Sequence, residues 1–469
     1  MTSSNTPYKH LFHLLILVTL VTFAQACNGY SDQVKQAKSL TLKGDMEEAV
    51  VALNERLEVD SELQTPDNLD HNQTLLLLER ATLLQAQGKY ALSARDMMIV
   101  DDRLEWLDID KMSLKDLSKR LYSPSKSNYQ APPYERLLLN TLNQINYLTD
   151  GDLEDARVEA RRFTVLEKYF LDDQNKTLQP ELIALGNYLS GATYESSGKY
   201  EEALTHYSKA WYYGLRDEEL RIRLRDLYRI SRRTTAPIND VFFEDLLKEA
   251  KQAGPLSRDE YFELHQRGDT LVITQFGYAP YKHAVNIPIQ TARQRAGVHV
   301  NPATGNSIHA IHFTELTSTG LPVRSLSSAR IRVDDKPVAL TQGMHVTRAV
   351  EMAWSLIEPK MVAAAILREE TRSAIGETGR KASSQAVSTH PVAGILGWLA
   401  ATSAQTALAA ADTPDTRSWS TLPAYIRIAR LQLPEGLHTV ESYIHGSGER
   451  QLVPVWSTKL NVVNFSKAR

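Results

Sequence analysis

The sequence predicts an α+β protein, in which an all-α repetitive half precedes a mixed half of antiparallel strands and inserted helices. A helical pattern with a recurring glycine-centred phrase extends from Ser31 to about Ala250. Strand patterns follow in the second half, and helix-breaking residues that end at Pro255 separate the two regions. The expected parts are a leader over residues 1–26, an α-helical repeat domain over residues 27–255 and a mixed α/β domain over residues 256–469.

The leader has the composition of a signal peptide. Lys9 precedes an apolar stretch of roughly 14 residues that ends near Ala24, which is too short to span a bilayer comfortably because that takes about 20 residues. We therefore expect an exported protein whose fold begins after residue 26. No later stretch of the sequence is plainly transmembrane.

The one cysteine, Cys27, follows the leader directly. Ala26-Cys27 resembles the end of a bacterial lipobox, although Ala24 and Gln25 depart from its usual pattern, and Ala24-Gln25-Ala26 also fits ordinary cleavage. We favour lipidation, because export would otherwise carry an unpaired thiol into an oxidising compartment. The resemblance, with Asn28 after the cysteine, implies a lipoprotein anchored in the outer membrane and facing the periplasm.

Composition excludes some classes of function. The 53 basic and 56 acidic side chains give a formal net charge of −3, which argues against a nucleic-acid binder that neutralises phosphates. With a single cysteine the chain has no internal disulfide, so its stability has to come from packing.

One short phrase recurs four times in the helical half, starting at Gly44, Gly88, Gly151 and Gly198. Each copy follows one amphipathic pattern and opens another. Glycine permits the left-handed turn that ends a helix, and the acidic residues that follow in most copies suit the first turn of the next helix. The sequence therefore predicts a series of helical hairpins.

The fourth copy carries most of a known spacing. Its small and aromatic residues fall where a tetratricopeptide repeat places its packing residues: Gly191, Tyr194, Gly198, Tyr200, Ala203, Tyr207 and Ala210. This region resembles a tetratricopeptide solenoid, in which small residues let helices approach and tyrosines fill the space between repeats. The four copies lie further apart than the about 34 residues of regular repeats, so we expect longer helices or an interruption, with a loop ending near Pro133.

A second resemblance covers both halves. It rests on Tyr134-Glu135, Asn140, Tyr147-Leu148, Gly151-Asp152, the run 156–162, Gly277, Pro280, Lys282 and the run 417–423. These positions resemble a family of bacterial envelope lipoproteins with a tetratricopeptide-like first half. The resemblance implies location and architecture, and assigns no activity.

In the mixed half we expect strands at about 270–340 and 424–463, separated by a helical insertion over about 344–411. Pro434-Glu435-Gly436 is expected to form a hairpin turn between two strands, and Leu452–Val463 to form one further strand. Pro359 is expected to kink or divide the insertion. Its apolar second part, residues 391–411, could be a membrane helix, but polar residues favour a helix packed on the protein.

The sequence contains no catalytic motif, and we expect neither metal nor cofactor. His309 and His312 have a spacing that suits metal ligands on a helix, but in a strand this spacing sends them to opposite faces. Arg221, Arg225 and Arg229 form a basic strip, which is either a solvated face balanced by nearby acids or a docking site for an anionic partner.

These observations favour a non-catalytic, lipid-anchored scaffold that holds a protein partner in the concave groove of its repeats, with no role for nucleic acid. The alternative is an envelope glycan-binding or glycan-hydrolysing protein with its site in the second half. In that case Trp419, Tyr425 and polar residues near Arg417 would line a cleft. A β-module that binds peptidoglycan without turnover is a third possibility.

Overall fold

The computed structural model describes residues 30–69, 72–106, 113, 128–172, 180–231, 233–296, 307–314, 329–341, 343–389, 415–444 and 447–467. Within these ranges the fold is α+β, as predicted, with helices in the first half and most strands in the second. Cys27, the leader and the apolar segment 391–411 lie outside the described residues.

The helices of the first half come in successive pairs. They are α2 (Tyr30–Lys43), α3 (Met46–Arg56), α4 (Gln73–Ala86), α5 (Tyr90–Arg103), α7 (Pro133–Asp150), α8 (Leu153–Asp172), α9 (Pro180–Ser196), α10 (Tyr200–Tyr212), α11 (Glu218–Ser231) and α12 (Val241–Ala253). The recurring glycines lie between the helices of the first four pairs, at φ values of 95°, 75°, 82° and 68°. Because side chains with a Cβ rarely adopt this conformation, the glycines set the turns.

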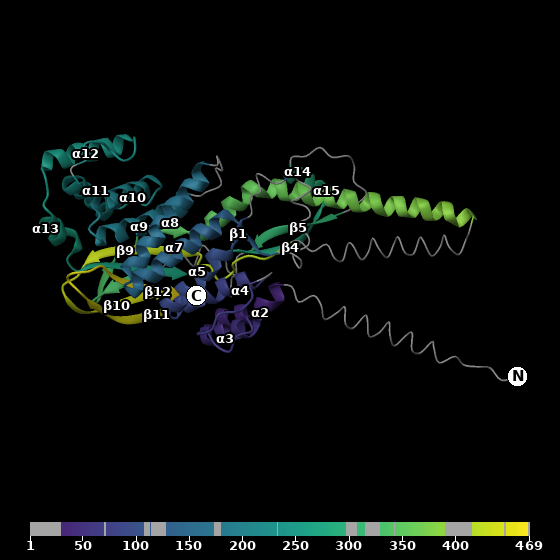
Figure 1. Cartoon of the computed structure of the whole chain (residues 1–469), viewed down its shortest axis with the longest axis horizontal. Coiled ribbons are helices and arrows are strands. Elements are labelled where there is room, and N and C mark those ends of the chain that lie inside the picture. Colours follow the sequence, from purple (N-terminus) through teal and green to yellow (C-terminus); the bar gives the residue numbers. More distant parts are fainter. Residues whose placement is uncertain are drawn as a thin grey trace.

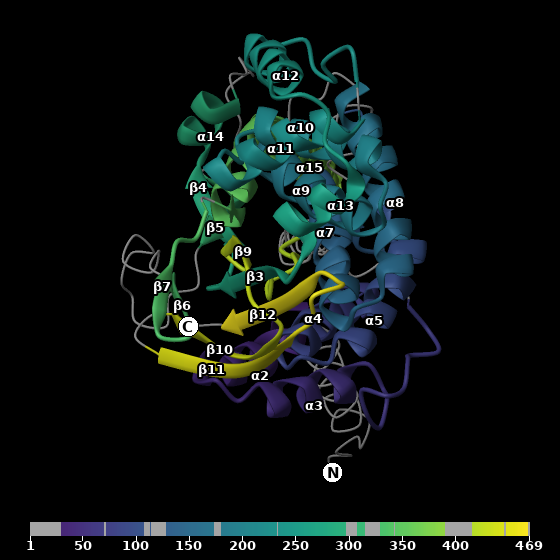
Figure 2. The same cartoon turned by 90° about the vertical axis from the view of Figure 1, so that its left-hand side faces the viewer.

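The helix pairs form an arc around the strands. Figure 2 shows this arc from α12 at the top, through α8 and α5, to α2 and α3 at the bottom, with β3, β9 and β12 inside it. Figure 1 shows the same helices along the length of the body. The two halves of the chain therefore pack together, and one buried apolar cluster contains residues from both, such as Leu189 of α9 and Ile428 of β9.

The strands of the second half form two four-stranded sheets and one ribbon. The first sheet has the order β12 (Asn461–Lys467), β3 (Asp269–Phe276), β9 (Tyr425–Gln432) and β8 (Met344–His345), and β12 is parallel to β3. The second has the order β11 (Ser447–Val455), β10 (Gly436–Ile444), β6 (Ala329–Val333) and β7 (Lys336–Val338). The ribbon pairs β4 (Tyr281–Pro288) with β5 (Ser307–Thr314).

The remaining elements are short. The two-residue strands β1 (Glu105–Trp106) and β2 (Gln130–Ala131) pair in parallel. Helix α13 (Arg258–Tyr261) and the π-helix η2 (Phe262–Gln266) connect the helical half to β3, and α14 (Ile289–Ala296) follows β4. The two four-stranded sheets share an apolar layer that includes Val272 and Phe465 from the first and Val333 and Val440 from the second.

Two expectations about the last strands are wrong. Pro434-Glu435-Gly436 does not close a hairpin, because β9 pairs with β3 and β8 whereas β10 pairs with β11 and β6. This turn carries the chain from one sheet to the other. The expected single strand Leu452–Val463 is divided between β11 and β12, since each of these strands belongs to a different sheet.

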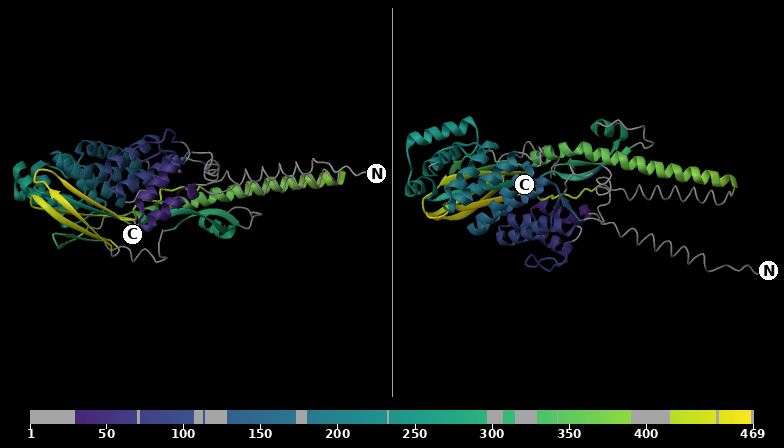
Figure 3. Two further views of the ribbon diagram at one scale, coloured as in Figure 1. Left: turned by 90° about the horizontal axis from the view of Figure 1, so that it is seen from below. Right: turned by 45° about the horizontal axis from the view of Figure 1, so that its top comes forward.

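The helical insertion also differs from the expectation. Met344 and His345 belong to β8, and α15 then extends as one helix from Val346 to Thr389, through Pro359. Trp354 precedes Pro359 and Met361 follows it, and both are buried in an apolar cluster with the β4–β5 ribbon. This packing stabilises the turns on both sides and offsets the hydrogen bond that proline cannot donate. The far part of α15 extends beyond the body (Figure 3).

The first helices of three pairs are buried on nearly all sides. This holds for residues 74–85 of α4, 137–148 of α7 and 182–195 of α9. A helix at the surface keeps one polar face exposed, so the concave side of these helices has to be covered. The chain covers it with its own elements: β12 lies on α4 and α7, and β8 and α15 lie on α9.

A buried cluster of charges joins the arc to the sheet. Arg430 of β9 forms ion pairs with Glu195 of α9 at 2.9 Å and with Asp269 of β3, and Arg223 of α11 pairs with the same Glu195. Tyr207 of α10 donates a hydrogen bond to Glu195. Burial alone would raise the pKa of Glu195, but the two arginines lower it below its ordinary value, so this carboxylate stays charged.

Replacing Arg430 with Met should lower the free energy of unfolding by about 3–5 kcal/mol, because it leaves buried carboxylates without their partner. Urea denaturation followed by circular dichroism measures this loss. Arg267→Met is the matched control, since Arg267 pairs with Glu263 on the surface and should contribute little. Equal effects of the two substitutions would contradict the role assigned to the cluster.

Candidate functional site

The concave side of the helices, which the sequence assigns to a partner, holds a segment of the chain itself. Trp419 is 1% exposed and its indole N–H donates to Thr82 of α4 at 2.8 Å. Arg417 pairs with Asp415 at 2.7 Å. Both side chains are therefore part of the protein interior, so Trp419 and Arg417 do not line an open cleft.

Two buried glutamates hold this segment. Glu79 of α4 accepts the backbone N–H groups of Ser420 and Thr421, each at 2.8 Å, and Glu135 of α7 accepts that of Trp419 at 3.3 Å. Burial raises the pKa of Glu135 to about 7, although nearby Lys282 opposes this shift. The carboxylates thus bind backbone of their own chain, an arrangement that satisfies these polar groups inside the protein.

The residues that carry the tetratricopeptide resemblance pack between α9 and α10. A Cβ on Gly191 would lie 2.5 Å from the ring of Tyr207, so glycine permits this close approach. Ala203 and Ala210 are fully buried, and the ring of Tyr194 stacks on His206 at 5.2 Å. Two further residues complete the set: Gly198 forms the turn, and the ring of Tyr200 contacts Tyr261 edge-on.

The basic strip lies on α11, and its arginines form ion pairs with acidic residues of the same chain. Arg221 pairs with Glu249 of α12 at 2.6 Å, and Arg225 pairs with Asp226 at 3.0 Å. Arg229 also pairs with Asp226 and donates to a backbone carbonyl oxygen. The three guanidinium groups therefore neutralise acids of their own helix pair.

His309 and His312 lie in strand β5, where they pair with Asn286 and His283 of β4. Among the residues that the structure describes, no group of three His, Cys, Asp or Glu side chains could hold a metal ion. No helix in these ranges is both long and apolar enough to cross a membrane.

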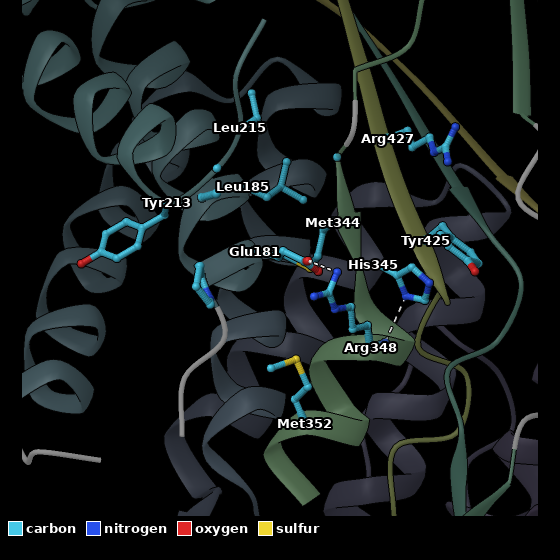
Figure 4. A pocket seen from close by; sticks show the side chains of 14 residues that line it. Glu181, Leu185, Tyr213, Leu215, Met344, His345, Arg348, Met352, Tyr425 and Arg427 are labelled. Atoms are coloured by element: carbon cyan, nitrogen blue, oxygen red, sulfur yellow. Dashed lines mark hydrogen bonds and ion pairs between the residues drawn. The ribbon is translucent and has the colours of Figure 1, made fainter. Parts of the chain in front are cut away.

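A cleft of about 480 Å³ lies where the arc, the first sheet and the start of α15 meet (Figure 4). This volume is within the range of roughly 300–1,000 Å³ that ligand sites have. The lining comes from four places in the chain: Pro180, Glu181, Ala184 and Leu185 of α9; Tyr213, Gly214 and Leu215 after α10; Gly343 to His345, Arg348 and Met352 around β8 and α15; and Tyr425 and Arg427 of β9.

The floor of the cleft is apolar. It consists of side chains that are each at most 5% exposed, and they come from both the helical half and the strands: Ala184, Leu185, Leu215 and Met344. Met352 is 41% exposed and lies one turn beyond Arg348 on α15. Methionine side chains adapt to irregular shapes, so this part of the lining can adjust to an occupant.

An ion pair crosses the cleft. Glu181 and Arg348 point toward one another (Figure 4), with 3.6 Å between carboxylate oxygen and guanidinium nitrogen. His345 caps α15 by accepting the backbone N–H of Arg348 at its Nδ1, which leaves the proton on Nε2. Burial lowers the pKa of His345, and the neighbouring Arg348 and Arg427 add to this effect, so the ring is neutral at pH 7.

No pattern in the sequence predicts this cleft. Glu181, Arg348 and Arg427 come from segments more than 70 residues apart, and none belongs to a recognisable motif. Of the residues proposed for a second-half site, the structure places Tyr425 at the cleft. Its ring stacks on Phe276 at 5.1 Å and contacts His345 at 4.3 Å, so it supports the wall of the cleft.

No protein-family model and no curated protein matches this chain.

The elevated pKa of Glu135 predicts a pH-dependent stability. Between about 4.3, the ordinary pKa of glutamate, and about 7 the folded protein holds a proton that the unfolded chain releases. This contribution makes the free energy of unfolding fall as pH rises through this window. Glu135→Gln removes the titrating group, so its stability relative to the wild type should increase from pH 5 to pH 8 in urea denaturation. A constant difference between Glu135→Gln and the wild type across this range would contradict the assignment.

Proposed function

We propose that this chain is an exported, non-catalytic protein of the cell envelope, anchored by lipid at Cys27, that binds protein partners through a tetratricopeptide-like framework. The observation that carries the proposal is the succession of helix pairs with glycine turns that pack into an arc. Arrays of helical hairpins offer extended surfaces for polypeptide partners rather than enclosed catalytic pockets.

Because the concave side is covered, we expect a partner to bind elsewhere on the arc. The concave side of α4, α7 and α9 is covered by the chain's own strands and by the segment around Trp419. We therefore expect a partner on the outer, convex side of the arc and at the cleft beside α9. The strands and the segment around Trp419 do not cover these two surfaces. The catalytic alternative has less support, because the buried carboxylates Glu79 and Glu135 bind backbone N–H groups of the chain itself.

The anchor would set the orientation of the body. Helix α2 begins at Tyr30, three residues after Cys27, and three residues span about 10 Å at most. A lipid at Cys27 would therefore hold the start of α2 close to the bilayer. The far part of α15 extends on the side of the body where α2 lies (Figures 1 and 3), so it would lie on the membrane side.

The test compares the intact chain with Cys27→Ala in crosslinked envelopes. Mass spectrometry of the wild type should find an acylated N-terminal cysteine, and affinity capture should recover protein partners reproducibly. Cys27→Ala should leave the membrane fraction and lose those partners whose capture depends on the anchor. An unmodified thiol on freely soluble protein would contradict the anchor, and absence of any crosslinked partner would contradict the scaffold.

A further inference from the structure

The cleft contains charged groups that lack full partners. Glu181 Oε2 is buried without any hydrogen bond. Arg348 is 62% exposed, and its 3.6 Å contact with Glu181 is long for a charge-assisted hydrogen bond. Arg427 also borders the cleft, and its guanidinium group points away from Glu181 and Arg348 (Figure 4). The cleft thus offers one buried acceptor and, facing it, the cationic group of Arg348.

These groups flank the apolar floor. Leu185 and Met344 form its base and Met352 its mouth, while Glu181 and Arg348 approach from the starts of α9 and α15. An unpaired buried carboxylate oxygen is costly unless a donor reaches it. An occupant that satisfies the whole cleft has to carry a hydrogen-bond donor, an apolar group and an anionic group close together.

The last residue of a polypeptide has this combination in its backbone N–H, its side chain and its terminal carboxylate. We propose that the cleft binds the carboxyl-terminal residue of a partner polypeptide that ends in a large apolar side chain. This inference rests on the proposed function, and it names the part of the partner that is bound. Capture of a chain terminus by a few charged and backbone groups is an established mode of peptide recognition.

Each group has a distinct role in this complex. Arg348 pairs with the terminal carboxylate, and the N-terminal end of α15, where Arg348 lies, adds a favourable field. Glu181 Oε2 accepts the backbone N–H of the last residue, and Arg348 lies between the two carboxylates and offsets their repulsion. The apolar side chain displaces water from Leu185, Leu215 and Met344.

Fluorescence anisotropy with the full chain tests this proposal. The probes are labelled peptides of the form Gly-Ser-Gly-Ser-Phe and Gly-Ser-Gly-Ser-Leu as free acids, the same peptides with an amidated end, and Gly-Ser-Gly-Ser-Gly. The free acids with Phe or Leu should bind, and amidation or a terminal Gly should weaken binding about tenfold, the effect of one such interaction. Arg348→Gln should weaken the free acids to the level of the amides and leave the amides unaffected.

The control variant is Arg332→Gln, at an exposed arginine of β6 outside the cleft, which should bind all peptides as the wild type does. Circular dichroism melting of both variants establishes that they fold. Equal affinity for acids and amides, or binding of no free-acid peptide, would overturn the proposal. Displacement of the peptides by free phenylalanine at equal concentration would overturn it in favour of a free amino acid.

The proposal can fail separately from the proposed function. If crosslinked partners are captured but no peptide binds, the scaffold stands and the cleft does not take a chain terminus. If no partner is captured in envelopes, the scaffold itself fails, whatever the peptides do.

Discussion

Burial of the concave side of the arc is the constraint on which the rest of the structure depends. Helices α4, α7 and α9 are buried on nearly all sides, so an arc without strands would expose both their apolar side chains and polar ones such as Glu79 and Gln144. The strands need the arc equally, since β3 and β9 contribute Leu271, Ile273, Ile426 and Ile428 to the apolar cluster that the helices mainly form. Arg430, bound on one side to Asp269 and on the other to Glu195, joins the two layers at their most polar point.

This mutual dependence explains the unusual chemistry of the concave side. Helical repeats commonly present polar side chains there for a partner's backbone. Here Glu79 and Glu135 accept the N–H groups of Trp419, Ser420 and Thr421, and the last two of these residues lie in a turn outside the strands. The helices thus bind a non-strand segment of their own chain.

The parts of the fold that could be predicted from sequence are those encoded locally. Glycines such as Gly151 and Gly198 mark helix ends by their own backbone preference, and alternation in Ala329–Val333 marks a strand. Strand pairing depends on contacts between distant segments, which is why Pro434 was assigned to a hairpin although it connects two sheets. The continuous helix through Pro359 likewise depends on packing that the local pattern does not record.

The candidate site was beyond sequence reasoning for the same reason. Glu181 reads as an ordinary first-turn acid of α9 and Arg348 as an ordinary surface arginine, and only folding places them on opposite sides of one cleft. The basic strip of α11 shows the reverse case: Arg221 and Arg225 stand out in the sequence, yet acids of α11 and α12 already neutralise them. The charge pattern of one helix is therefore a weaker indication of a binding site than the cleft that α9, α15 and the first sheet form together.

The 44 residues of α15 make a rod of about 66 Å, at 1.5 Å per residue. Val346 and Val350 fix its base in the main core, and Arg348 on the same turns borders the cleft. Trp354 keeps the next turns against the β4–β5 ribbon, and this packing continues to Ile366, so the part that projects to Thr389 is about 35 Å long. A tilt of about 5° in this projecting part would displace its far tip by about 3 Å.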